Sequence, residues 1–203
     1  MYLIFKNIVD FLLSSFLLVI LSPALLLIII ILKLFTSGSV FFIHYRIGKN
    51  GKIFKLYKFR TMKTSRDIIL KDYFKNNPQE KLKWEENYKL KKDPRITKIG
   101  YFLREFSLDE FPQLLNIIKG DMSFIGPRPI VNKEISKYGH NYNKYKTVKP
   151  GLTGLWQVSG RNNTTYKQRV DYDMYYIQNR SFILDCKIFL KTIPVIISRK
   201  GAY

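Results

Sequence analysis

Two adjacent carboxylates, Asp109 and Glu110, stand just before Pro112 in this sequence. Because proline has no N–H, it is tolerated in the first turn of a helix, which predicts an N-cap near Asp109 and a helix that stops at Gly120. Free N–H groups and the helix dipole favour anions at such an N-terminus. A pair of carboxylates there is suited to hold a divalent cation together with a phosphate group.

The acid pair also has a purely structural interpretation. Aspartate is a favoured N-cap residue, and Ser107-x-x-Glu110 fits the capping-box pattern. One helix later, however, Arg128 stands between Pro127 and Pro129, and each proline restricts the backbone around it. An arginine that presents two parallel donors to a phosphate benefits from this restraint, whereas a solvated arginine does not need it. The arginine therefore favours phosphate chemistry.

Longer blocks of the chain resemble a known family. They are residues 58–62 (KFRTM), 104–113 (REFSLDEFPQ), 120–129 (GDMSFIGPRP) and 150–162 (PGLTGLWQVSGRN), together with Asp173-x-Tyr175-Tyr176 and the terminal GAY. The chain is similar over nearly its whole length to the bacterial sugar transferases, the monotopic polyprenol-phosphate phosphoglycosyl transferases. Larger relatives carry additional spanning helices before this domain, and we do not expect them in 203 residues.

The resemblance implies an enzyme that transfers a sugar-1-phosphate from a UDP-sugar to polyprenyl phosphate, expected to be undecaprenyl phosphate, and releases UMP. It implies that Asp109 is the nucleophile of a covalent phosphosugar-aspartyl intermediate, and that Glu110 assists as metal ligand or acid/base. Mg²⁺ is the expected cofactor, held by Asp109 and Glu110. The residues expected to bind substrate are Lys58, Arg60, Arg104, Arg128, Gln157, Arg161 and Asp173.

The composition fits an anionic partner. The chain has 35 Lys and Arg against 15 Asp and Glu, a formal net charge of +20. This charge suits nucleic acid, acidic lipid headgroups or phosphorylated substrates. Nucleic acid would not explain the apolar N-terminus, so we expect no nucleic-acid partner. The single Cys186 excludes an internal disulfide and fits a reducing compartment, and His44 and His140 are too scattered for a zinc site.

Residues 11–32 contain no charged side chain and are long enough to cross a bilayer, which takes about 20 residues. Ser22-Pro23 interrupts this run, and proline kinks a helix because it removes a backbone hydrogen bond. Lys6 and Lys33 flank the run, so the charges alone permit either a kinked span or a hairpin that dips into one leaflet.

The family resemblance favours the re-entrant hairpin. We therefore expect a membrane hairpin over residues 1–36, broken at Ser22 and Pro23, and a catalytic domain over residues 37–203. The protein is then monotopic, in contact with membrane lipid on the cytosolic face of the bacterial inner membrane. The sequence leaves open whether it forms a homo-oligomer.

The rest of the chain predicts an α+β fold. Alternating apolar residues around Asn50-Gly51 predict a β-hairpin over residues 40–62, with Lys58 and Arg60 on one face of the returning strand. Two cations on one face can address one diphosphate, although a solvated basic face would look the same. The helical parts expected after this small hairpin make the catalytic domain mainly helical.

Helical periodicity predicts the later elements. Segments broken near Asn77-Pro78 are followed by a helix from about residue 96 that brings Arg104 to the acid pair. Another helix is predicted over residues 166–178 after a loop-rich stretch around Trp156, which suits either the core or a stacking platform. Residues 181–198 are apolar but interrupted by charges, which predicts an amphipathic interfacial helix.

Two rival functions remain at this stage. Asp171-x-Asp173 could serve as the metal motif of a glycosyltransferase, which would form a glycosidic bond and release UDP. A non-enzymatic protein that binds anionic membrane surfaces would need the basic charge but not Asp109, and its binding would weaken steeply with salt. The sequence does not determine which UDP-sugar is used or which glycan is built.

Overall fold

The structure, a computed structural model, describes residues 1–87, 90, 92–161 and 164–198. Its elements are α1 (Tyr2–Phe35), β1 (Phe41–Ile47), η1 (Lys49–Gly51), β2 (Ile53–Phe59), α2 (Arg66–Asn76), α3 (Pro78–Asn87), α4 (Lys98–Glu105), η2 (Leu108–Gln113), α5 (Leu114–Ile118), β3 (Ser123–Ile125), η3 (Asn132–Glu134), α6 (Ile135–Tyr138), η4 (Gly139–Asn141), α7 (Tyr142–Tyr145), β4 (Gly151–Thr153), α8 (Leu155–Val158), α9 (Tyr166–Asn179) and α10 (Phe182–Ile197). The terminal GAY and Asn162 of the family blocks lie outside the described residues.

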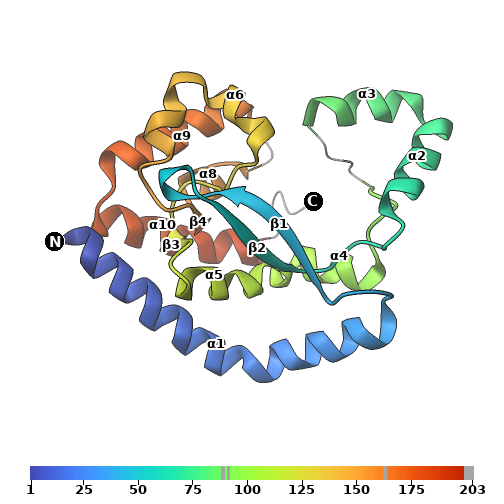
Figure 1. Cartoon of the computed structure of the whole chain (residues 1–203), viewed down its shortest axis with the longest axis horizontal. Helices are drawn as coiled ribbons and strands as arrows, with labels where there is room; N and C mark the ends of the chain where they lie inside the picture. Colours follow the sequence, from blue (N-terminus) through green and yellow to red (C-terminus); the bar gives the residue numbers. More distant parts are fainter. Residues whose placement is uncertain (88–89, 91, 162–163, 199–203) are drawn as a thin grey trace.

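The N-terminal helix α1 is one piece, so the expected break into two helices is wrong. Pro23 lies inside α1, and the helix bends near its middle (Figure 1). The Ser22 hydroxyl donates a hydrogen bond to the Val19 carbonyl at 2.7 Å. Because one proline removes only one N–H from the helical ladder, the helix can bend at this point without ending.

The start of α1 is held to the rest of the chain by polar contacts. Tyr2 and Lys6 donate hydrogen bonds to the Asp185 carboxylate of α10, at 2.6 Å and 2.5 Å. Asp10 is buried and accepts a hydrogen bond from the Phe124 N–H of β3 at 3.1 Å. This end of the helix is therefore fixed against β3 and α10.

The second half of α1 is held by apolar contacts. Leu25 and Leu32 are buried in a cluster with Phe59 of β2 and Leu103 of α4. The opposite side of α1 carries exposed apolar side chains along its length, and within the described residues α1 is the helix long and apolar enough to cross a membrane. The helix thus has one face on the protein and one apolar face without protein contacts.

The predicted β-hairpin forms from β1 and β2, antiparallel, with Phe41 opposite Phe59. Asn50 and Gly51 turn the chain with φ of 58° and 75°, the left-handed region that these residue types tolerate best. Phe54 and Leu56 of β2 face the core, and by alternation Lys58 lies on the same side of the strand. The strand therefore presents Lys58 inward.

The core surrounds β3 and β4, a short parallel pair with Ser123 opposite Gly151 and Ile125 opposite Thr153. Glycine is required where these segments meet, since a Cβ on Gly151 would lie 2.1 Å from the nitrogen of Gly126. The core side chains packed around this pair include Leu114, Ile117, Met122, Ile130, Tyr138, Val170 and Ile188.

The predicted helices are present. α2 and α3 meet at Asn77-Pro78 as expected, and the pair stands apart from the other helices (Figure 1). α4 begins after Thr97, whose hydroxyl accepts a hydrogen bond from the Gly100 N–H at 2.9 Å. The buried stripe of α9 contains the predicted residues Val170, Met174 and Ile177. The α+β class is confirmed: helices dominate, and the two sheets are small.

Candidate active site

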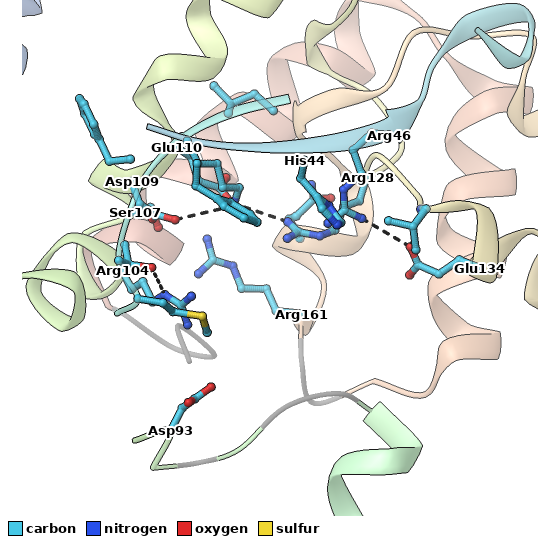
Figure 2. A pocket seen from close by; sticks show the side chains of 18 of the residues that line it. His44, Arg46, Asp93, Arg104, Ser107, Asp109, Glu110, Arg128, Glu134 and Arg161 are labelled. Atoms are coloured by element: carbon cyan, nitrogen blue, oxygen red, sulfur yellow. Dashed lines mark hydrogen bonds and ion pairs between the residues drawn. The ribbon is translucent and has the colours of Figure 1, made fainter. Parts of the chain in front are cut away.

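A cleft of about 2420 Å³ contains the acid pair on its wall (Figure 2). It extends from α2, α3 and α4 past the β1–β2 hairpin, η2 and the loop after β3 to α8, α9 and α10. Of the residues predicted to form the site, those that line the cleft are Lys58, Arg60, Arg104, Asp109, Glu110, Arg128, Gln157 and Arg161.

Asp109 and Glu110 lie in the first turn of η2, and the N-cap is Ser107, so the predicted cap at Asp109 is wrong. Ser107 has a φ of 56°, which turns the chain sharply after α4 and starts η2 earlier than the proline position suggested. Within the described part of the chain its hydroxyl makes no capping hydrogen bond, so the capping box of the purely structural alternative does not form. Both carboxylates are therefore released from capping and face the cleft.

Lys58 contacts both carboxylates of the pair. Its Nζ lies 2.5 Å from Glu110 Oε1 and 3.7 Å from Asp109 Oδ2. Arg128 approaches from the other side, with NH1 4.0 Å from Glu110 Oε1. Asp109 is 8% exposed and accepts no hydrogen bond from any residue that the structure describes. Glu110 is thus held by Lys58 at hydrogen-bond distance, whereas Asp109 faces the same ammonium only at 3.7 Å.

The electrostatic environment separates the two acids. Burial raises the pKa of Asp109, and the nearby cations Lys58 and Arg104 offset this only in part. Burial also acts against the ionised form of Glu110, but Lys58 and Arg128 outweigh it and lower its pKa to about 2. Glu110 is therefore held in its ionised form, and the ionised form of Asp109 is the less stabilised of the two.

Arg128 is held in place through its backbone and by an aromatic ring. Its carbonyl accepts a hydrogen bond from the Tyr145 hydroxyl at 3.2 Å, and the Pro127 carbonyl accepts one from the Gly151 N–H at 2.8 Å. The guanidinium carbon lies 5.9 Å from the ring centre of Trp156, which is buried. These contacts direct the guanidinium along the cleft wall toward the acid pair (Figure 2).

Arg104 comes to the acid pair from α4, as predicted. Its Nε donates a hydrogen bond to the Thr61 hydroxyl at 2.8 Å. Gly100 permits this approach, because a Cβ there would lie 2.0 Å from the Thr61 carbonyl oxygen. Arg161 points into the cleft between Arg104 and Arg128 (Figure 2). Thr61, which the sequence analysis did not select, therefore orients one of the site's cations.

Two other predicted residues occupy different surroundings. The guanidinium of Arg60 donates a hydrogen bond to the Ser37 carbonyl at 3.4 Å, so Arg60 is turned toward the end of α1 and does not join Lys58. Gln157 is buried in the cleft wall, and neither atom of its amide has a hydrogen-bond partner among the described residues. A buried, unpaired amide is costly, which fits a side chain that meets a ligand.

Asp173 lies in the core below the cleft, and the structure does not bring it to the acid pair. It is 1% exposed and accepts a hydrogen bond from the Tyr138 hydroxyl at 2.6 Å. Burial raises its pKa to about 7, although the nearby Arg169 acts in the opposite direction. Asp171 is exposed on the other side of α9, since residues two apart on a helix point in different directions. The two aspartates therefore do not form a shared metal site.

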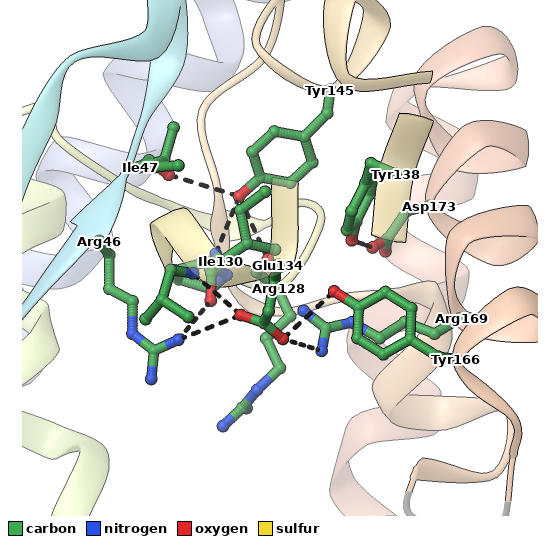
Figure 3. Close-up of polar contacts among 12 residues, drawn as sticks. Arg46, Ile47, Arg128, Ile130, Glu134, Tyr138, Tyr145, Tyr166, Arg169 and Asp173 are labelled. Atoms are coloured by element: carbon green, nitrogen blue, oxygen red, sulfur yellow. Dashed lines mark hydrogen bonds and ion pairs between the residues drawn. The ribbon is translucent and has the colours of Figure 1, made fainter. Parts of the chain in front are cut away.

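Sequence reasoning missed a second group of charged residues in the cleft: Arg46 of β1, Glu134 of η3 and Arg169 of α9 (Figure 3). Arg46 NH1 lies 3.6 Å from Glu134 Oε2, and Arg169 NH1 lies 3.1 Å from Glu134 Oε1. The signal in the sequence was weak. Arg46 lies on the same, less exposed face of β1 as Phe42 and His44, because residues two apart on a strand share a face. Nothing in the sequence connects these three positions, which come together only in the tertiary structure.

The acid pair fits Mg²⁺ only together with a substrate. Among the described residues no group of three or more His, Cys, Asp or Glu side chains is placed to hold a metal ion. Asp109 and Glu110 supply two adjacent carboxylates, and magnesium characteristically uses one or two carboxylates plus substrate phosphates. The donor set therefore suits an ion that is completed by a diphosphate.

Comparison with known proteins identifies the relatives of this chain. The profile of a family described as Bacterial sugar transferase matches residues 1–199. The chain is 46% identical over 198 residues to the exopolysaccharide production protein ExoY of Sinorhizobium fredii, covering 98% of this chain and 88% of that protein. It is 45% identical over 198 residues to the undecaprenyl-phosphate galactose phosphotransferase of Salmonella typhimurium, covering 98% of this chain and 41% of that protein.

A third relative is more distant in sequence. The UDP-glucose:undecaprenyl-phosphate glucose-1-phosphate transferase of Klebsiella pneumoniae is 35% identical over 209 residues, covering 99% of this chain and 42% of that protein. The chain therefore spans less than half of the length of several curated relatives and most of the length of others.

Proposed function

The chain belongs to the bacterial sugar transferase family, and from this premise we propose that it transfers a sugar-1-phosphate from a UDP-sugar to polyprenyl phosphate and releases UMP. The observation that carries the proposal is the buried Asp109 carboxylate, which accepts no hydrogen bond from the described residues and lies in a cleft lined with cations. The names of the relatives from Salmonella and Klebsiella, which act on undecaprenyl phosphate, support the same lipid acceptor here.

The proposed reaction has two displacements at one phosphorus atom. A carboxylate oxygen of Asp109 attacks the sugar-bearing β-phosphorus, and the bond from this phosphorus to the oxygen shared with the α-phosphorus breaks, so that UMP leaves with that oxygen. A phosphate oxygen of the polyprenyl phosphate then attacks the same phosphorus and releases the Asp109 carboxylate. Both nucleophiles are already anionic, so neither step requires a general base.

The cations of the cleft stabilise the charge that develops during both displacements. Lys58 and Arg128 flank the acid pair at the distances given above, and Arg104 and Arg161 reach it from two further elements. Preorganised donors of this kind cost no reorganisation at the moment of reaction. Mg²⁺ held by Asp109 and Glu110 would neutralise the diphosphate and reduce its repulsion from the nucleophile.

The attachment of α1 supports a monotopic arrangement on one side of a membrane. The start of the helix binds Asp185 and Phe124, and its second half packs on Phe59 and Leu103. A helix that crossed the bilayer would place its ends on opposite sides, about 30 Å apart, and a charged domain could not contact both. We propose that the bent α1 dips into the cytosolic leaflet of the bacterial inner membrane with both ends on the cytosolic side.

The last helix extends the same membrane-facing surface. α10 is joined to α1 through Asp185 and exposes the apolar residues Phe182, Ile183, Phe189, Leu190, Ile193 and Ile197. A helix with an exposed apolar face of this kind suits the interface between headgroups and acyl chains. The cleft, bordered by α10, then lies at the level where a lipid phosphate is found.

The placement of α1 can be tested with single cysteines in a Cys186→Ser background. Leu3→Cys and Ser39→Cys should both resist an impermeant thiol reagent in intact cells and react after permeabilisation. Lys71→Cys on α2 is the matched control for a cytosolic position. Labelling of Leu3→Cys from outside intact cells would establish a spanning helix instead.

The reaction itself is tested by product analysis. The purified full chain is incubated with polyprenyl phosphate and a panel of UDP-sugars, and nucleotide products are separated. At least one UDP-sugar should yield UMP together with a lipid-linked sugar diphosphate. Release of UDP with a glycosidic product would instead support the glycosyltransferase alternative, and no product with any sugar would support a membrane-binding role.

A further inference from the structure

The Arg46–Glu134–Arg169 group carries more positive charge than its single acid neutralises. Both Glu134 oxygens are occupied: one accepts hydrogen bonds from Arg169 and the Tyr166 hydroxyl, and the other accepts one from the Val131 N–H and faces Arg46. One carboxylate is thus shared by two guanidinium groups. Burial, together with the nearby Arg128, lowers the pKa of Arg46 to about 10, as expected for a cation among cations. Burial acts against the charge of Arg169, but this charge is also stabilised by Tyr138, Tyr166 and the buried Asp173, which raise its pKa. Arg46 is therefore the cation of the group with the least compensated charge.

The same group contains donors without partners. Arg169 has only 9% of its side chain exposed, yet its Nε and NH2 have no hydrogen-bond partner among the residues that the structure describes. The Nε of Arg46 and the amide of Gln157 are buried and lack partners in the same sense. All three side chains line the cleft. Unpaired donors in the lining of one cleft suit a ligand with several acceptor oxygens, such as a phosphate group.

Arg128 lies between the acid pair and the Arg46–Glu134–Arg169 group. Arg128 lies 4.0 Å from Glu110, and its guanidinium shares the Trp156 ring with that of Arg169, at 5.9 Å and 4.9 Å from the ring centre. Figure 2 shows the order Asp109, Glu110, Arg128, Arg46 along the cleft. A group displaced from phosphorus departs on the side opposite the nucleophile. For a diphosphate that lies along this line of residues, the leaving phosphate departs from Asp109 in the direction of Arg46 and Arg169.

We propose that Arg46 and Arg169, supported by Glu134, form the subsite for the leaving phosphate monoester, the α-phosphate of the UDP-sugar that departs as UMP. This inference rests on the proposed function. The bond to the β-phosphorus breaks with its electron pair on the bridging oxygen, and the two guanidinium groups receive that charge. The acceptor lipid also carries a phosphate monoester. The test must therefore distinguish binding of the UMP phosphate from binding of the polyprenyl phosphate.

The test uses the full chain in detergent and the variants Arg46→Lys and Arg169→Lys, which keep the charge beside Glu134 but lose the planar fork of donors. Inhibition by UMP and by uridine is measured against UDP-sugar. UMP should inhibit each variant about tenfold more weakly, whereas uridine, which has no phosphate, should inhibit variants and wild type equally. Exchange of labelled UMP into UDP-sugar without acceptor should slow in parallel. The KM for polyprenyl phosphate should rise as well, because the acceptor phosphate attacks the intermediate from the side that UMP has left.

Arg180→Lys, outside the cleft on the loop after α9, is the matched control and should leave all four quantities unchanged. A raised KM for polyprenyl phosphate with unchanged UMP inhibition would overturn the inference and assign the subsite to the acceptor. Equal weakening of UMP and uridine, or no weakening of either in both variants, would overturn it as well. Failure of wild type to exchange UMP in the absence of acceptor would contradict the two-displacement reaction itself, which separates the two failures.

Discussion

The cleft has two regions in which an acid lies among arginines, and they differ in what the acid is left to do. At Glu134, both oxygens are satisfied by hydrogen bonds, and although burial acts against its ionised form, Arg169 and the Val131 N–H lower its pKa. At Asp109, among the described residues, no hydrogen bond is accepted and burial raises the pKa. The same residue types thus give a fixed support in one region and an available carboxylate in the other.

The difference originates in the backbone. Glu134 closes η3 and reaches back to the N–H of Val131, so its carboxylate is used locally. Asp109 follows Ser107, whose left-handed conformation sends the chain into η2 without a side-chain cap. An acid released from capping and buried beside cations is what nucleophilic attack on phosphorus requires.

The largest effect is expected from Asp109→Asn, because it removes the proposed nucleophile. Turnover should fall by several orders of magnitude, roughly 10³-fold or more. Labelled UDP-sugar without acceptor should leave label on a peptide containing Asp109 in wild type and none in the variant. Asp171→Asn, an exposed acid on α9, is the matched control. Near-normal turnover of Asp109→Asn would refute the assignment.

For the free energy of unfolding we expect the reverse order, with the larger effect at Glu134 and little or none at Asp109. Glu134→Gln leaves Arg169 and Arg46 without their anion and should lower the free energy of unfolding by about 1.5–3 kcal/mol. Asp109→Asn removes a buried charge that has no hydrogen bond to lose, so the stability should be unchanged or higher. Denaturant unfolding of both variants in the same detergent makes the comparison. Equal destabilisation of the two would mean that the acids are equivalent supports.

Arg128→Lys tests whether the region near Asp109 needs a directed guanidinium or only positive charge. The lysine keeps the charge but loses the planar pair of donors that the flanking prolines present. Transition-state stabilisation should fall by about 1–3 kcal/mol, measured as kcat/KM at fixed ionic strength. Arg180→Lys should be silent. Equal activity of Arg128→Lys and wild type would show that a diffuse positive field suffices.

A third acid, Asp173, is buried in the core and belongs to neither region. Its folded pKa of about 7 is above the value near 3.9 of an exposed aspartate, so its contribution to stability is complete below about pH 4 and is lost as the pH rises to about 7. Asp173→Asn should flatten this part of the dependence of the melting temperature on pH, since the amide oxygen can still accept the Tyr138 hydrogen bond. If the melting temperatures of variant and wild type changed equally with pH between about 4 and 7, the raised pKa of Asp173 would be contradicted.

Local signals in the sequence were sufficient for most of the secondary structure. Asn50-Gly51 specified the hairpin because these residues tolerate positive φ, and the apolar stripe of α9 specified its buried face. The acid pair and the proline-flanked Arg128 indicated the cleft that contains them. These features depend on residues close together in the chain, which is why the sequence alone indicated them.

Only the tertiary structure decided how each charged group is used. Ser107 took the cap position predicted for Asp109, Asp173 was buried in the core, and Arg46 met Glu134 and Arg169 from distant elements. Likewise α1 stayed in one piece across Pro23, with contacts to the protein at both of its ends. Burial and hydrogen-bond partners arise from contacts between remote segments, and these set the charge, the pKa and the availability of a side chain.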